Sequence, residues 1–191
     1  MTKQVHGFYL YGMWGPVTDP GARDMTQRMS AELPGIDMHD SPYRDYDVNE
    51  ICGIIKELPN DAIIIVCGTS LGANNTPVVG AYAYLNDRKR VIHGIWSFQA
   101  SVWGARGGVD PSYPGITPNV EFAHLISSDA PENFGLGAYR WISTPGNTVT
   151  NGNGQPLITV HNYPHPGDGV VADQDMFLDE MKRVIASAQN A

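Results

Sequence analysis

The sequence predicts an α/β fold, a three-layer sandwich whose mostly parallel central sheet is covered by helices on both faces. Segments with strand character alternate with segments of helical spacing along most of the chain. The apolar run Ala62–Val66 lacks the polar alternation of a half-exposed strand, as expected for a strand buried on both faces of a parallel sheet. With 191 residues and no internal repeat, we expect one domain spanning residues 1–191.

Local signals bound each expected element in the first half of the chain. The first strand runs into the Gly- and Pro-rich segment Gly12–Gly21, and the first helix stops at the Pro34-Gly35 pair. Asp47 can cap the second helix, which has Glu50 three residues further on and isoleucines along one face. We therefore expect strands at His6–Gly12, within Gly35–Asp47 and at Ala62–Cys67, and helices at Ala22–Leu33, Asp47–Leu58 and Ala73–Leu85.

The second half of the chain continues the same alternation. Strands are expected at Arg90–Gln99 and within Ile116–Ser128, because both segments are rich in apolar and β-branched residues. The segment Thr148–Asn162 has two β-rich arms around the Asn-Gly-Asn-Gly tetrapeptide 151–154, which indicates a hairpin. A closing helix is expected at Ala172–Ala188, where apolar residues recur near one face.

Composition narrows the classes of function. The formal net charge is −8 and no basic stripe is present, so a polyanionic partner such as nucleic acid is not expected. No segment approaches the ~20 apolar residues that span a bilayer, and no signal peptide is evident at the N-terminus. Cys52 and Cys67 are expected to be free thiols, which favours a cytoplasmic protein. No metal is expected, because none of the six histidines belongs to an HExxH or Cys-paired pattern.

The segment Gly68-Thr69-Ser70-Leu71-Gly72 stands between the expected buried strand and an expected helix. A serine on so sharp a turn is presented at the carboxyl end of the sheet, and the flanking glycines keep side chains out of the way. The free N–H groups at the start of the helix favour a developing negative charge. A tight turn without chemistry is the alternative, but the strand–turn–helix context favours Ser70 as a nucleophile.

A serine nucleophile needs a histidine base. Where the serine stands on a strand–turn–helix of this kind, the histidine comes later in the chain. Two candidates, His161 and His165, come between the last expected strand and the last helix. We favour His165, because it lies in the loop beyond the strand and is flanked by prolines, where its side chain can reach over the site. His93 and His124 lie inside expected strands, and a structural role is expected for them.

The acid that orients the base is expected at the end of a strand between the serine and the histidine. Asp129 directly follows an apolar strand and is the preferred candidate, with Glu132 in reserve. Asp110 and Asp168 are interpreted as turn residues.

The oxyanion of the reaction needs two backbone N–H donors. One is expected from Leu71, immediately after the serine, and the other from the segment after the first strand, with Met13 preferred and Trp14 next. Trp14 and Trp103 are also predicted to line the substrate pocket. For Trp103, the alternative is that it only pins its long loop to the body of the protein.

Together these motifs resemble those of the α/β-hydrolase superfamily, in particular small lidless bacterial lipases and esterases. Gly68–Gly72 resembles the nucleophile elbow, which is often Gly-His-Ser-x-Gly, and Tyr11–Gly15 stands where such enzymes have His-Gly-x-Gly-Gly. Val160–His165 resembles the terminal segment in which the second histidine is catalytic. Tyr11 and Thr69 replace histidines of the usual pattern, and neither replacement removes a required chemical role.

The motifs and the resemblance predict hydrolysis of a carboxylic ester or thioester through an acyl-serine, with Ser70, His165 and Asp129 as the triad. The expected partner is a small ester or acyl substrate, and no cofactor is required. Two alternatives use the same fold: a binding module without turnover, and acyl transfer to an alcohol or amine. Amide or peptide hydrolysis ranks lower, because no segment suggests a defined peptide groove.

Overall fold

The computed structural model describes residues 2–12, 20–39, 48–69, 71–87, 90–98, 117–128, 162–163 and 173–191. Strands and helices alternate along these residues. In chain order they are β1 (Val5–Leu10), α1 (Pro20–Glu32), β2 (Ile36–His39), α2 (Val48–Glu57), β3 (Ile63–Thr69), α3 (Leu71–Asn86), β4 (Gly94–Phe98), β5 (Ala123–Ser128), β6 (Asn162–Tyr163) and α5 (Gln174–Asn190). The expected hairpin at 151–154 lies outside the described residues.

The strands form one six-stranded sheet in the order β2-β1-β3-β4-β5-β6. Every neighbouring pair is parallel. All seven residues of β3 are buried, which explains the unbroken apolar run: this strand lies inside the sheet and has helices over both of its faces. The prediction of a mostly parallel sheet is confirmed.

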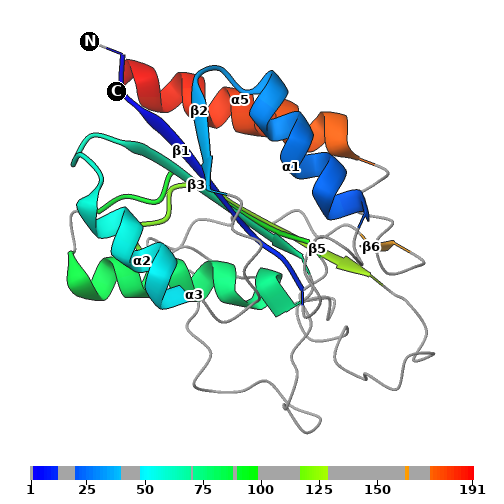
Figure 1. Ribbon diagram of the computed structural model, residues 1–191, viewed down its shortest axis with the longest axis horizontal. Helices are drawn as coiled ribbons and strands as arrows, with labels where there is room; N and C mark the ends of the chain where they lie inside the picture. Colours follow the sequence, from blue (N-terminus) through cyan, green and yellow to red (C-terminus); the bar gives the residue numbers. More distant parts are fainter. Residues whose placement is uncertain are drawn as a thin grey trace, which may run out of the picture.

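Two hydrophobic cores separate the sheet from its helical layers. On one face, apolar side chains of α1 and α5 pack against alternate residues of the strands, among them Tyr9, Ile65 and Trp96. On the other face, α2 and α3 pack against the intervening residues, among them Phe8 and Val66. Figure 1 shows the resulting sandwich, with α1 and α5 on one side of the sheet and α2 and α3 on the other. The three-layer prediction is therefore confirmed.

Several boundaries differ from those expected. The first helix begins at Pro20 instead of Ala22, since proline fits the first turn of a helix, where no N–H is needed. The helix after the serine begins at Leu71 instead of Ala73, directly after β3. The β3-to-α3 turn is therefore tighter than the sequence pattern indicates.

Pro77 lies inside α3 and has no N–H to offer the carbonyl of Ala73, four residues before it. Two buried hydroxyls lie near that carbonyl instead: Thr76 Oγ1 at 2.9 Å and Ser97 Oγ, from β4, at 3.2 Å. The two hydroxyls are also 2.5 Å apart. This group replaces the lost helix bond and ties the first turns of α3 to the neighbouring strand.

The two ends of the described chain lie side by side, as Figure 1 shows. The backbone N–H of Lys3 donates to Oε1 of Gln189 at 2.9 Å, and its ammonium group donates to the carbonyl of Ala188 at 2.7 Å. These contacts hold the residues before β1 against the last turn of α5. Among the described helices, none combines the length and the apolar character needed to cross a membrane.

Candidate active site

The carboxyl ends of β1 and β3 flank the point at which the sheet changes its direction of winding. From β1 the chain moves outward to β2 on one side, and from β3 it continues to β4, β5 and β6 on the other. Leu10, the last residue of β1, is paired with Gly68, near the end of β3. In open parallel sheets ligands bind at this switch point, so we expect the functional residues among those that follow β1 and β3.

The turn from β3 to α3 requires glycine at both flanking positions. A Cβ on Gly68 would lie 2.6 Å from the carbonyl carbon and oxygen of Gly72. A Cβ on Gly72 would collide with the carbonyl oxygen of Leu10 and lie 2.6 Å from that of Tyr11. All these neighbours are backbone atoms, which cannot turn aside. The start of α3 is thus packed directly against the end of β1, and both glycines of the Gly-x-Ser-x-Gly pattern have a steric role.

Ser70 itself lies outside the described residues, but both of its neighbours are described. Thr69 is the last residue of β3, and Leu71 is the first residue of α3. The first N–H groups of a helix have no carbonyl partner within it, and the positive end of the helix dipole lies there. The N–H of Leu71, which we expected to bind the oxyanion, is therefore at a helix start.

A buried hydroxyl pair fixes the residue before the serine. Tyr9 Oη lies 2.6 Å from Thr69 Oγ1, and both residues are buried. The Tyr9 ring packs on Tyr11, with ring centroids 4.9 Å apart, and Tyr11 Oη lies 2.9 Å from Thr26 Oγ1 on α1. The end of β3 is thus bound to β1 through Tyr9. Sequence reasoning missed this pair, because its residues are 60 positions apart and no local pattern joins them.

Replacing Tyr9 with phenylalanine tests this anchor. Among the described residues the Thr69 hydroxyl has no other hydrogen-bond partner, so the change leaves a buried hydroxyl unsatisfied. We expect unfolding to become easier by about 1–3 kcal/mol, measured by urea denaturation. Tyr11→Phe is the matched control, because Thr26 keeps its bond to the carbonyl of Ala22 and the loss should be smaller. Equal losses in the two variants would contradict the assignment.

The other predicted site residues, Met13, Trp14, Trp103, Asp129, Glu132, His161 and His165, lie outside the described residues. The described residues next to some of them are informative. Ser127 and Ser128, which precede Asp129, pair with Asn162 and Tyr163, which follow His161. The structure therefore brings the strand before the expected acid alongside the strand that separates the two candidate bases.

Two histidines that we had expected to be structural, His93 and His124, have hydrogen-bond partners among the strands and helices of the fold. His93 Nδ1 accepts a hydrogen bond from the backbone N–H of Ile64 at 3.1 Å, just before β4 begins. Burial is the main cause that lowers the pKa of His93 to about 4, so its ring is neutral at pH 7. His124 Nδ1, on β5, lies 2.7 Å from Oε2 of Glu180 on α5.

Glu180 joins α5 to two strands of the sheet. Its Oε2 atom contacts His124 and also accepts a hydrogen bond from the indole N–H of Trp96 at 3.0 Å. Burial alone would raise the pKa of Glu180, but the bonds to His124 and Trp96 outweigh it, and the pKa is lowered. The carboxylate thus stays ionised inside the protein and holds α5, which follows the segment that carries His165.

Glu180→Gln should therefore destabilise the fold in a pH-dependent way. At neutral pH we expect a loss of about 1–3 kcal/mol in urea denaturation, because the charged bonds weaken. Since folding lowers the pKa of Glu180, its contribution is complete above the unfolded-state pKa and disappears as the pH falls through the folded-state value. The wild type and the variant should converge in acid. The control is Asp179→Asn, on the same helix with a side chain 71% exposed, and its stability should differ little from that of the wild type. If the difference in stability between the wild type and Glu180→Gln were the same at all pH values, this role of Glu180 would be refuted.

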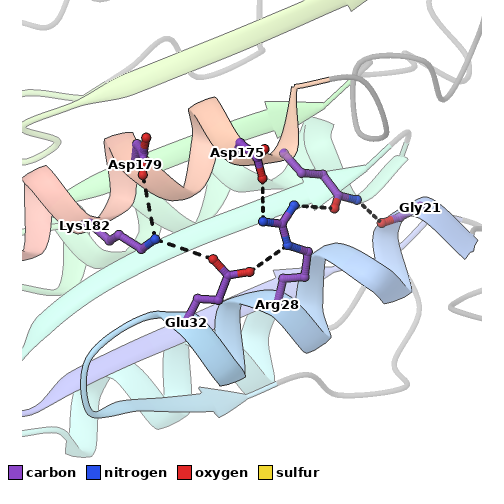
Figure 2. Close-up of polar contacts among 7 residues, drawn as sticks. Gly21, Arg28, Glu32, Asp175, Asp179 and Lys182 are labelled. Atoms are coloured by element: carbon purple, nitrogen blue, oxygen red, sulfur yellow. Dashed lines mark hydrogen bonds and ion pairs between the residues drawn. The ribbon is translucent and has the colours of Figure 1, made fainter.

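A polar network runs between α1 and the first half of α5, as Figure 2 shows. Arg28 donates to Glu32 at 2.8 Å and to Asp175 at 2.6 Å, and Lys182 lies 3.5 Å from Glu32. Beneath them the buried Gln174 accepts from Arg28 at 3.1 Å and donates to the carbonyl of Gly21 at 3.4 Å. The exposed ion pairs are worth little singly, but the bond from Gln174 fixes the first residues of two helices. These helices follow the segments that carry Met13 and His165.

Among the described residues, one group has donors suited to a metal ion: His6, Asp37 and His39, on β1 and β2. Sequence analysis did not find it, because about 30 residues separate His6 from the other two and only the parallel pairing brings them together. His6 stands near the amino end of β1, away from the switch point.

The parallel sheet, its winding order and the strand–turn–helix at the switch point fit the α/β-hydrolase fold. No protein-family model and no curated protein sequence matches the chain. Solved structures do resemble it. Est1E from Butyrivibrio proteoclasticus gives a TM-score of 0.59 at 10% identity and covers 100% of this chain and 90% of its own. Human thioesterase 2 gives a TM-score of 0.54 at 6% identity, and the match covers 96% of this chain and 97% of the thioesterase. RedJ, a thioesterase from the prodiginine pathway of Streptomyces coelicolor, gives a TM-score of 0.53 at 11% identity. The match covers 95% of this chain and 90% of RedJ. These structures confirm the fold resemblance, and they are esterases and thioesterases.

Proposed function

We propose that this protein is a serine hydrolase that cleaves a carboxylic ester or thioester through an acyl-serine at Ser70. The observation that carries the proposal is the steric demand for Gly68 and Gly72 around that serine. The helix start packed onto the carbonyls of Leu10 and Tyr11 makes this turn as tight as the nucleophile-elbow pattern requires. A serine nucleophile benefits from it, because a sharp turn exposes the side chain beside free helix N–H groups.

His165 acts as the general base in the proposed mechanism. It removes the proton of Ser70 as the serine oxygen attacks the substrate carbonyl, and later gives that proton to the leaving alcohol or thiol. Asp129 orients the imidazole and stabilises its positive charge. Water then attacks the acyl-enzyme by the same steps and releases the acid. Parallel pairing of β5 with β6 supports this assignment, because it aligns the segments next to the acid and the base.

The N–H groups of Leu71 and Met13 bind the oxyanion in this mechanism. The close approach of Gly72 to Leu10 and Tyr11 supports the pair, since it brings the start of α3 next to the end of β1, three residues before Met13. Trp14 and Trp103 line the pocket for a small ester or acyl substrate, and the chemistry requires no cofactor.

Turnover of model substrates tests the proposal. The protein should hydrolyse p-nitrophenyl esters and acyl thioesters at a rate proportional to its concentration, and an added alcohol or amine should not divert most of the acyl group. A folded protein that turns over neither substrate would favour a binding module instead. Transfer of most acyl groups to the added acceptor would reassign the activity to acyl transfer.

A further inference from the structure

We propose that His6, Asp37 and His39 form a binding site for a divalent transition-metal ion, with Zn²⁺ as the ion that fits best. The site lies on the edge of the sheet formed by β1 and β2. It is independent of the proposed hydrolase chemistry and of Ser70.

The parallel register creates the group. His6 of β1 is paired with Asp37 of β2, so their side chains lie side by side on the same face of the sheet. Asp37 and His39 are two residues apart on β2, and alternate residues of a strand point to the same face. The three side chains therefore share one face at the sheet edge.

The distances among the three donor atoms match those of a tetrahedral site. His6 Nδ1 and His39 Nε2 are 3.1 Å apart, and Asp37 Oδ2 lies 3.5 Å from the first and 3.6 Å from the second. With metal–ligand bonds of about 2.0–2.1 Å, two ligands of a tetrahedral Zn²⁺ ion are roughly 3.3 Å apart. The three atoms thus occupy three corners of such a site. An octahedral ion with the same bond lengths needs shorter separations of about 2.9 Å.

The rings are held in these orientations by stacking. His39 lies nearly flat on Phe8, with centroids 4.6 Å apart and an angle of 10°, and it also stacks on His6 at 5.4 Å. His6 is buried, and Nδ1 is its only ring nitrogen with a hydrogen-bond partner among the described residues. The group therefore needs little rearrangement to accept an ion, which keeps the cost of binding low.

Charge and exposure also suit a metal ion. The Asp37 carboxylate lies beside the two imidazoles and supplies the negative charge that a cation needs. The Asp37 side chain is 68% exposed, so the site opens to solvent and water can fill the fourth position. Two imidazoles and one carboxylate form a ligand set suited to Zn²⁺ and related ions.

The alternative is a hydrogen-bonded cluster in which a proton lies between His6 and His39. A bound ion would replace that proton and fasten the short edge strand β2 to β1. The site stands about four residues, roughly 13 Å, from the carboxyl end of β1, so its occupancy should not alter the serine chemistry directly.

Zinc binding by tag-free protein tests the proposal. All proteins carry Cys52→Ser, which removes the partly exposed thiol as a competing ligand. After treatment with a chelator, Zn²⁺ is titrated in competition with a chromophoric chelator, and Co²⁺ is added separately to record visible spectra. The variants are Asp37→Asn and His39→Gln, both at incompletely buried positions, and their folding is checked by circular dichroism. Asp61→Asn, an exposed carboxylate just before β3, is the matched control.

We expect one Zn²⁺ per chain and intense Co²⁺ bands of the tetrahedral type. Asp37→Asn and His39→Gln should each weaken Zn²⁺ binding at least about tenfold, and Asp61→Asn should leave it unchanged. Zn²⁺ should raise the Tm of the parent protein and of Asp61→Asn but not of the other two variants. Absence of stoichiometric binding, or equal affinity in all variants, would overturn the proposal in favour of the hydrogen-bonded cluster.

Discussion

Alanine at Ser70 or at His165 should each lower kcat by about 10⁴- to 10⁶-fold, and the double variant should be no slower than the worse single one. The reason is that nucleophile and base act as one unit: without the serine there is no proton for the base to remove, and without the base the serine stays protonated. The remaining activity would come from the oxyanion N–H groups and substrate binding. The measurement is steady-state hydrolysis of a p-nitrophenyl ester, with folding checked by circular dichroism.

His161→Ala is the matched control for this prediction, because it stands four residues before His165 in the same segment. It should retain most of the activity. If His161→Ala lost activity and His165→Ala kept it, His161 would be the base and the mechanism would otherwise stand. Full activity in Ser70→Ala would remove the mechanism itself.

Gly72→Ala should destabilise the protein by about 4 kcal/mol or more and abolish hydrolysis. The new Cβ would overlap the carbonyl oxygen of Leu10, a backbone atom of the last residue of β1, which is paired with Gly68 of β3. Relief therefore requires α3 to shift away from β1, and with it the residues on either side of Ser70. Urea denaturation and ester hydrolysis measure the two effects.

Gly53→Ala provides a control of opposite sign. Gly53 lies in α2, and a Cβ there has no neighbour within 4 Å. Alanine is a better helix former than glycine, so this variant should be more stable by about 0.5–1 kcal/mol and keep full activity. If Gly72→Ala were also more stable and fully active, the conclusion that α3 packs tightly on the end of β1 would be wrong.

Much of the fold could be predicted, because its signals are local. The run Ala62–Val66 indicated a central strand, and all of it but Ala62 lies in β3, the third strand of six in the sheet order. The strand–helix alternation indicated parallel pairing and helices on both faces, and the two cores confirm this. The predicted start of α3 was two residues later than the observed start. Its first turn contains no apolar periodicity, and packing on β1 sets its position.

The long-range contacts of the structure could not be predicted in the same way. Tyr9 and Thr69, Glu180 and His124, and the His6–Asp37–His39 group each join residues far apart in the chain. Strand order and register create these neighbours, and the local spacing of residues in one segment does not reveal which strand lies beside it. The turn that carries Ser70 was predictable because its signals are local, whereas the proposed acid and base were assigned only from their order along the chain.

Labelling with a fluorescent fluorophosphonate tests the central claim most directly, because the probe reacts with a serine activated by a neighbouring base. The labelled residue is identified by mass spectrometry of the wild type, with Ser70→Ala and Gly53→Ala as comparisons. The account predicts one label on Ser70 in the wild type and in Gly53→Ala, and none in Ser70→Ala. A folded wild-type protein that takes no label, or takes it equally in Ser70→Ala, would contradict it.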